Sequence, residues 1–273
     1  MAADNGFRQP RALGRTGLMV SRLGISSGYG IPAAPLEKAF HEHGINFFYW
    51  GTLRRAAMAE AIRNIAKTDR ARLVVMLQSY DHPGWWVRRS VEKGLRALSL
   101  DHVEILLLGW VNRYPSPRLV DACLKLQQEG KVRHLAVSGH DRPFHGTLAA
   151  KADSPFGAQM LRYNAVHRGA EQEIFPLIPS ANPPGIIAYT ATCWSQLLRP
   201  GKMPSGEPPM TAADCYRFVL SNPQVDVCMT GPANADQLTH AITALDLGPL
   251  SPAEMDRARR LGDFIHKKKG LFF

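Results

Sequence analysis

Short apolar runs alternate with amphipathic segments along most of this chain. A continuous apolar run such as Val103 to Leu108 is typical of a strand buried on both faces, and Arg118 to Glu129 carries apolar residues at helical spacing. The pattern predicts eight strands, at residues 23–25, 45–48, 72–77, 103–108, 132–137, 157–162, 185–189 and 225–229. It predicts a helix after each strand, at residues 35–43, 56–67, 84–98, 118–129, 143–151, 171–178, 211–221 and 234–245.

Eight strand and helix pairs in a chain of 273 residues predict an α/β fold of the (β/α)8 TIM-barrel type. The turn-rich Gly14 to Gly17, between short alternating segments, predicts an N-terminal β-hairpin that caps the barrel. A capping box with proline at the first helical position, Ser251 to Glu254, predicts an extra C-terminal helix to about residue 268. We expect a flexible N-terminus over residues 1–10 and one barrel domain over residues 11–273.

Composition narrows the class of protein. The chain has no run near the roughly 20 apolar residues of a membrane span, and its polar start lacks the apolar core of a signal peptide, so we expect a cytoplasmic protein without a membrane partner. The four cysteines are far apart in sequence, which predicts free thiols and no metal site.

The net charge of +10 is compatible with nucleic acid, with a membrane surface or with a field that attracts a phosphorylated cofactor. The basic residues are spread along the chain, and no recognition helix, zinc finger or basic stripe with interleaved aromatics is present. We therefore expect a small-molecule substrate and no nucleic-acid partner, in a monomer or a homo-oligomer.

Candidate chemistry gathers where the second predicted strand ends, in the stretch from Gly44 to Arg55. The apolar residues of this strand run directly into Tyr49 and Trp50 and then into Arg54. Active sites of (β/α)8 barrels lie at the carboxyl ends of the strands, so these side chains are expected to face a pocket.

Several segments resemble the aldo-keto reductase family, in the order in which that family has them. They are Leu13 to Gly24, Gly44 to Phe48, Glu129 to Ser138, Tyr163 to Arg168, Ala188 to Thr190, Leu220 to Pro223, Thr230 to Gln237 and Leu250 to Glu254. The resemblance covers about residues 11 to 262 and implies the barrel, an NADP(H) cofactor and the reduction of carbonyl compounds. In the family a tyrosine gives the proton, lysine and aspartate lower its pKa, and histidine orients the carbonyl.

This chain departs from the family at all four of those positions. By the resemblance, Tyr49 replaces the aspartate, Arg54 the tyrosine, Gln78 the lysine and Gly109 the histidine. A phenol of ordinary pKa near 10 is a useful acid at neutral pH only beside a cation, and glutamine is neutral, so the family's proton relay cannot operate here.

Other side chains are expected to replace this relay in one wide aromatic mouth. The candidate catalytic residues are Tyr49, Arg54, Gln78, Tyr80 and His140, and the candidate substrate pocket is formed by Trp50, Trp110 and Trp86. A tyrosine with a pKa lowered by Arg54, or else His140, would supply the proton. We expect His145 to be exposed and without a role in this pocket.

The resemblance also implies where a nicotinamide cofactor would lie. Its candidate residues are Ser138, Tyr189, Gly231, Asn234 and Gln237. Two amide side chains that the family uses against the nicotinamide are replaced by Gly139 and Met160, while a helix that begins after Gly231 could hold phosphate through its backbone amides.

Two functions are compatible with these residues. The first is an atypical NAD(P)H-dependent oxidoreductase that acts on a small carbonyl or related organic substrate with a rebuilt proton relay. The second is a non-redox barrel protein, either an isomerase or lyase type of catalyst or a ligand-binding pseudoenzyme, that uses the aromatic, arginine-containing pocket.

Overall fold

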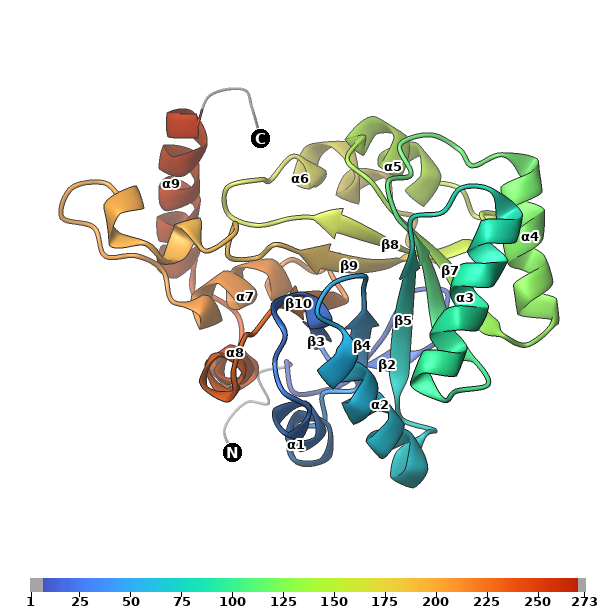
Figure 1. Cartoon of the computed structure of the whole chain (residues 1–273). Helices are drawn as coiled ribbons and strands as arrows, with labels where there is room; N and C mark the ends of the chain where they lie inside the picture. Colours follow the sequence, from blue (N-terminus) through green and yellow to red (C-terminus); the bar gives the residue numbers. More distant parts are fainter. Residues whose placement is uncertain (1–6, 270–273) are drawn as a thin grey trace.

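The computed structural model describes residues 7–269 and contains a closed barrel of eight parallel strands (Figure 1). The strands pair in the order β10-β3-β4-β5-β6-β7-β8-β9. Their bounds are β3 (Leu23–Ser26), β4 (Phe47–Trp50), β5 (Val74–Ser79), β6 (Val103–Leu108), β7 (Val132–Ser138), β8 (Phe156–Arg162), β9 (Gly185–Tyr189) and β10 (Val227–Thr230). The predicted (β/α)8 fold is confirmed.

Helices connect the strands and cover the outside of the barrel (Figure 1). They are α1 (Ala33–His43), α2 (Ala56–Asp69), α3 (Gly84–Leu98), α4 (Pro117–Gln128), α5 (Arg142–Ala149), α6 (Ala170–Glu173), α7 (Ala212–Leu220) and α8 (Ala235–Leu247). The additional helix α9 (Pro252–Lys269) follows, as the capping box predicts. Short 3-10 turns are η1 (Ser27–Tyr29), η2 (Phe175–Leu177), η3 (Gln196–Leu198) and η4 (Pro200–Lys202).

The predicted hairpin closes the barrel at the amino ends of the strands. It consists of β1 (Arg11–Ala12) and β2 (Met19–Val20), which pair antiparallel. Leu13 and Val20 are fully buried among the inward-facing side chains of the barrel. The opposite, carboxyl end of the strands is therefore the end where a site can open.

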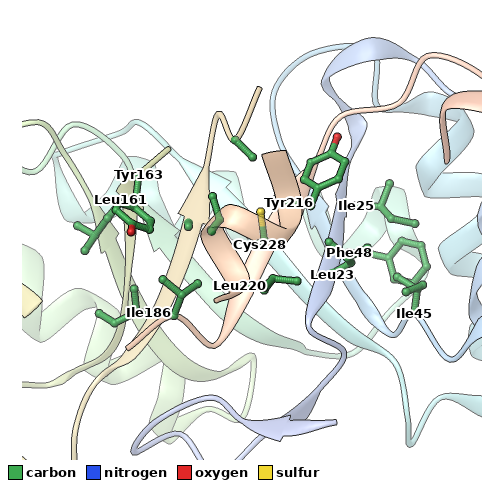
Figure 2. Packing of buried hydrophobic residues seen from close by; sticks show 14 of the residues in the cluster. Leu23, Ile25, Ile45, Phe48, Leu161, Tyr163, Ile186, Tyr216, Leu220 and Cys228 are labelled. Atoms are coloured by element: carbon green, nitrogen blue, oxygen red, sulfur yellow. The ribbon is translucent and has the colours of Figure 1, made fainter. Parts of the chain in front are cut away.

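Two apolar layers hold the barrel together. The inner layer contains the side chains that the strands direct into the barrel, and the larger outer layer lies between the strands and the helices. Figure 2 shows part of the outer layer, where Cys228 of β10 lies beside Tyr216 and Leu220 of α7. All four cysteines are buried free thiols, as predicted.

Two strands lie two residues later than predicted: the third, predicted at residues 72–77 and observed at Val74–Ser79, and the second, predicted at residues 45–48 and observed at Phe47–Trp50. Asn46 does not join the strand because its side chain bonds to the hairpin: its Oδ1 accepts from the amide of Ser21, and its Nδ2 donates to the carbonyl of Met19. Tyr49 and Trp50 consequently belong to the strand and point to opposite faces of it.

A second error concerns the helix predicted at residues 171–178. The structure divides this segment into α6 and η2, because proline at position 176 has no amide hydrogen to continue the helical ladder. Both elements cover the barrel beside the end of β8.

The prediction of a flexible N-terminus falls mostly on residues 1–6, which lie outside the described residues. Phe7 is buried in the outer layer, and Arg8 forms a 2.6 Å ion pair with Asp246 of α8. Between residues 7 and 269, no helix combines the length and the apolar character that crossing a bilayer requires.

Candidate active site

The uppermost inward-facing side chains of the strands form what we call the mouth layer. Strands direct every second side chain to the same face. The inner apolar layer includes Phe47, Met76, Leu107, Ala136, Met160, Ile187 and Met229, one from each of seven strands. Two residues further along the same strands or just beyond their ends come Tyr49, Gln78, Gly109, Ser138, Arg162, Tyr189 and Gly231. The barrel is therefore apolar below this level and polar at it.

One side of the mouth layer is built around the hydroxyl of Tyr49, which donates to Oε1 of Gln78. Burial raises the pKa of Tyr49 well above its ordinary value, and Tyr80 adds to this through its charge and a side-chain hydrogen bond. Tyr49 consequently keeps its proton across the physiological range. That proton is directed at Oε1 of Gln78.

Tyr80 occupies the space beside Gly109, the position at which the family resemblance places a histidine. A Cβ on Gly109 would lie 2.4 Å from Cε1 of Tyr80 and 2.9 Å from Nε2 of Gln78. No larger side chain fits at position 109 while Tyr80 keeps this place. The ring of Tyr80 is 37% exposed, so Tyr80 is the member of this group that a substrate can reach.

Trp110 extends the aromatic surface of Tyr80 toward solvent. The two ring centroids are 4.7 Å apart, and Trp110 is 65% exposed. Its backbone adopts the left-handed conformation, with φ of +58°, which is unfavourable for a residue with a side chain. Amide hydrogen bonds from Gly109 to the carbonyl of Ser79 and from Val111 to that of Ser138 hold this geometry.

The other side of the mouth layer carries a histidine, an arginine and a second tyrosine. Arg162 ends β8 and is the register partner of Tyr189 on β9. The hydroxyl of Tyr189 lies 3.4 Å from Nδ1 of His140, which follows the end of β7. The three residues therefore come from adjacent strand ends and form one cluster.

Arg162 influences the protonation of both neighbours. The pKa of His140 is lowered by partial burial first and then by the positive charge of Arg162, so this imidazole is neutral at pH 7. Burial raises the pKa of Tyr189, against an opposing effect of Arg162. At neutral pH this side of the mouth thus carries a cation beside two uncharged groups.

Two asparagines fix the loops that carry this cluster. Oδ1 of Asn112 accepts from the amides of His140 and Asp141, at 2.6 and 3.0 Å. Nδ2 of Asn164 donates to the carbonyl of Thr190, directly after Tyr189, at 2.8 Å. The cluster therefore rests on backbone positions that are held in place.

Trp50, predicted to line the pocket, is not at the mouth. It points outward from β4 into the outer apolar layer and is 3% exposed. Its indole nitrogen donates to the carbonyl of Arg55, and the guanidinium of Arg55 lies 4.3 Å from the centre of a Trp50 ring. This corrects the prediction, which treated Tyr49 and Trp50 as residues beyond the strand and overlooked their opposite directions.

Arg54, predicted to lower the pKa of a catalytic tyrosine, also lies elsewhere. It is exposed, with φ of +44°, and its aliphatic carbons pack beside Gly30. It is not among the groups that affect the pKa of Tyr49, and that pKa is raised rather than lowered. We therefore correct the expected pairing of Arg54 with a phenol.

Trp86, the third predicted pocket residue, stands in the first turn of α3. It is 49% exposed and makes an edge contact with Trp85, with ring centroids 5.0 Å apart. The structure thus leaves Trp86 on the surface and does not bring it to the residues of the mouth layer.

His145, expected to be exposed, is 1% exposed. Its Nδ1 lies 2.7 Å from Oε1 of Gln159, and its Nε2 would be 2.7 Å from a Cβ on Gly139. Such a Cβ would also lie 2.3 Å from the carbonyl oxygen of Val111. The glycine at 139 is therefore required by packing, and the asparagine of the family does not fit there.

The residues expected at the phosphate end of a cofactor form the start of α8. Asn234 caps the helix by accepting from the amide of Gln237 at 2.9 Å, and Oε1 of Gln237 accepts from the amide of Ala233 at 2.8 Å. The ring of Tyr29 covers Gly231, since a Cβ there would lie 2.7 Å from the ring. The side chains of Asn234 and Gln237 thus serve the helix cap, and any ligand would meet backbone amides.

Sequence reasoning missed Arg162. The signal was present, because Ala158, Met160 and Arg162 alternate along a strand whose bounds were predicted within one residue. Among the residues that the structure describes, no cluster of three or more metal-ligating side chains occurs.

The comparisons with known proteins agree with this architecture. The model of the aldo/keto reductase family matches residues 32–214, which is more than half of the chain. This chain belongs to the aldo/keto reductase family. The mouth layer therefore stands on the scaffold of this family.

A curated member with a similar sequence is L-galactose dehydrogenase of Arabidopsis thaliana. The two are 32% identical over 155 residues, which is 47% of this chain and 48% of that protein. The match therefore spans about half the length of this relative.

Solved structures of the family share the fold. An aldo-keto reductase from Bacillus halodurans has a TM-score of 0.75 at 19% identity and covers 93% of this chain and 95% of its own. An aldo-keto reductase from Klebsiella pneumoniae, solved in complex with NADPH, has a TM-score of 0.73 at 22% identity, with 93% and 95% covered.

Proposed function

We propose that this protein is an NADP(H)-dependent oxidoreductase that reduces a small carbonyl compound, with Tyr80 as the proton donor. The observation that carries the proposal is the position of Tyr80, which fills the space beside Gly109 at the mouth of a reductase barrel. Tyr80 is backed by Tyr49 and Gln78, so a polar group stands where the family's tetrad would be.

The residues present fit a nicotinamide nucleotide, with fewer polar contacts than the family uses. At one end, the amides of Ala235 and Asp236 in the first turn of α8 have no intrahelical acceptor and are available to an anion such as phosphate, against the negative charge of Asp236 in the same turn. At the other end, the hydroxyl of Ser138 makes no hydrogen bond to any residue between 7 and 269. Tyr189 offers a ring at the neighbouring strand end. These groups would hold the cofactor.

Reduction of a carbonyl adds a hydride to carbon and a proton to oxygen. A bound reduced nicotinamide supplies the hydride. Tyr80 donates its hydroxyl proton to the substrate oxygen, which hydride addition makes strongly basic, without the cation that the family's relay places beside its tyrosine. Because its ring reaches solvent, the phenolate left behind recovers a proton from water. Tyr49 stays protonated behind it and keeps the position of the Tyr80 oxygen fixed.

The relatives support this chemistry at the level of reaction type. L-galactose dehydrogenase is named for the oxidation of a sugar hydroxyl, which is the reverse direction of carbonyl reduction, and the Klebsiella pneumoniae protein binds NADPH. Because these similarities cover half of the first relative and only the fold of the second, the substrate has to be found by experiment.

The test combines cofactor binding with turnover. NADPH fluorescence is titrated against the protein, and NADPH oxidation is then followed at 340 nm with a panel of small aldehydes and oxo acids. We expect saturable binding and turnover, and a loss of kcat of about 10²-fold or more in Tyr80→Phe. Tyr114→Phe is the matched control, because Tyr114 is an exposed tyrosine that contacts Phe156 and Lys151 away from the mouth layer.

Unchanged kcat in Tyr80→Phe would remove Tyr80 from the mechanism. Absence of saturable NADPH binding would refute the cofactor assignment and with it the proposed function.

One observation favours the non-redox alternative. Tyr189 and His140 approach each other across the end of β8, and neither Gly139 nor Met160 offers an amide side chain to a nicotinamide. A ligand-binding role on this barrel predicts that carboxylates raise the melting temperature while NADPH leaves it unchanged. Stabilisation by NADPH alone would exclude this alternative.

A further inference from the structure

Arg162 is a cation at the mouth, and no acidic side chain among residues 7–269 pairs with it. Its side chain points inward at the end of β8 and is half-buried. Between residues 7 and 269, the structure shows neither an ion pair nor a hydrogen bond from its guanidinium. A guanidinium presents five N–H donors in a planar fork, so most of its binding capacity is available.

Other shielded arginines of this protein are treated differently. Arg22 donates to the carbonyls of Asp226, Leu220 and Val225. Arg217 bonds to Asp214 and to both carboxylate oxygens of Glu254, in addition to two backbone carbonyls. The fold thus satisfies its structural arginines with built-in acceptors, and Arg162 stands out from them.

The two groups beside Arg162 carry no negative charge at neutral pH. His140 is kept neutral beside it, and Tyr189 is a protonated phenol at neutral pH. A small cavity adjoins Arg162 on the outer side of β8. It is lined also by Arg142 and by Leu161 and Ile174 of the outer layer, and no aspartate or glutamate is among its lining residues. Arg142 is already paired with Glu173 at 2.7 Å, so Arg162 is the cation that an incoming anion would meet.

We propose that Arg162 binds the carboxylate of the substrate, so that this oxidoreductase acts on small oxo acids. A carboxylate matches the planar fork of a single arginine in a bidentate pair, whereas a phosphate dianion at this point would leave one of its charges without a partner. The exposed Trp110 ring beside Tyr80 would hold an apolar or aromatic part of the same molecule. The reduction of the acid rests on the proposed function, whereas the binding of the acid by Arg162 does not depend on it.

The test compares phenylglyoxylate with its neutral methyl ester, because both present the same ketone beside a phenyl ring. NADPH oxidation gives kcat and KM for each compound, and quenching of tryptophan fluorescence gives binding without turnover. We expect the wild type to prefer the acid. Arg162→Met should weaken binding of the acid by about 10- to 100-fold and leave the ester unchanged, and Arg162→Lys should fall between.

Arg133→Met is the matched control, since it removes the same charge from an exposed position near the opposite end of β7. We expect it to change neither compound's constants. Circular dichroism and the melting temperature verify that each variant is folded.

The outcomes separate the two proposals. Acid and ester handled alike by both the wild type and Arg162→Met would overturn the role of Arg162 and leave the reductase intact. Phenylglyoxylate that quenches fluorescence in an Arg162-dependent manner without any NADPH oxidation would uphold the acid site and refute the reaction.

Discussion

The two sides of the barrel mouth differ in their charge and in how their polar groups are paired. On the side of β4, β5 and β6, Tyr49, Gln78 and Tyr80 use their hydrogen-bonding groups on one another and carry no charge. On the side of β7, β8 and β9 stand His140, Tyr189 and Arg162, and the guanidinium has no acidic partner among residues 7–269. We refer to these as the neutral wall and the charged wall.

The two walls are suited to different parts of a ligand. The neutral wall is packed, because Tyr80 and Gln78 fill the space beside Gly109. The charged wall is fixed through its backbone. A group that donates a proton needs a fixed position, and a cation that binds an anion needs free donors.

The largest expected effect is on the free energy of unfolding, and it compares two tryptophans on opposite sides of the neutral wall. Trp50 is 3% exposed in the outer layer, so Trp50→Ala should lower the free energy of unfolding by about 3–5 kcal/mol. Trp110 is 65% exposed, so Trp110→Ala should change it by less than about 1 kcal/mol. Urea unfolding measures both. Equal losses would mean that the two tryptophans are not on opposite sides of the wall.

The next effect concerns the packing of the neutral wall. Gly109→Ala places a methyl group against the ring of Tyr80 and should cost about 1–3 kcal/mol of stability. Tyr80→Ala in the same chain should remove most of that cost, which a double-mutant cycle measures. Gly201→Ala is the control, because a Cβ there meets no atom within 4 Å. Additive costs would show that Tyr80 does not fill this space.

A smaller effect compares one phenol from each wall. Tyr49→Phe leaves the buried Oε1 of Gln78 without its donor and should cost about 1 kcal/mol. Tyr189→Phe removes only the 3.4 Å approach to His140 and should cost less. Chemical denaturation measures the free energy of unfolding of both variants. A larger loss of stability in Tyr189→Phe would contradict the assignment of the hydrogen-bonded phenol to the neutral wall.

The smallest effect is a pH dependence that belongs to the charged wall. The pKa of His140 is lowered in the folded protein, so the unfolded chain binds a proton more readily as the pH falls below about 6.5. The contribution of His140 to stability therefore decreases from pH 7.5 to pH 5.5, against an opposite contribution of Asp226, whose pKa burial raises to about 6. His140→Asn should remove only a small decrease, because solvent screens an exposed imidazole.

His145 provides the comparison for this measurement. Burial lowers its pKa as well, and it is far less exposed than His140, so its replacement should flatten the profile more. Urea midpoints at several pH values report both. Replacements that leave the slope of the profile unchanged, or that make the decrease toward pH 5.5 steeper, would contradict the lowered pKa values.

The barrel could be predicted from the sequence because strands and helices each have a characteristic spacing of apolar residues along the chain. Val103–Leu108 was predicted to the residue, since both faces of that strand are buried. The second strand was displaced by two residues because the apolar Ile45 looks like part of it, while the side chain of Asn46 bonds to the hairpin and the Arg72 carbonyl.

The site could be predicted only where the alternation of the strands was applied. Tyr49, Gln78, Ser138 and Tyr189 all lie on the inward-facing positions, and so does Arg162, which was overlooked. The place of Arg54 depends on the left-handed turn after β4, which the residue types around it do not specify. The role of Gly109 became visible only with the ring of Tyr80 beside it.

One measurement tests most directly whether the two walls have separate tasks. Steady-state oxidation of NADPH with phenylglyoxylate is compared among the wild type, Tyr80→Phe and Arg162→Met. We expect Tyr80→Phe to lower kcat with little change in KM, and Arg162→Met to raise KM with little change in kcat. Two variants that change the same constant to the same extent, or neither constant, would contradict the division of the mouth into a proton-donating and an anion-binding wall.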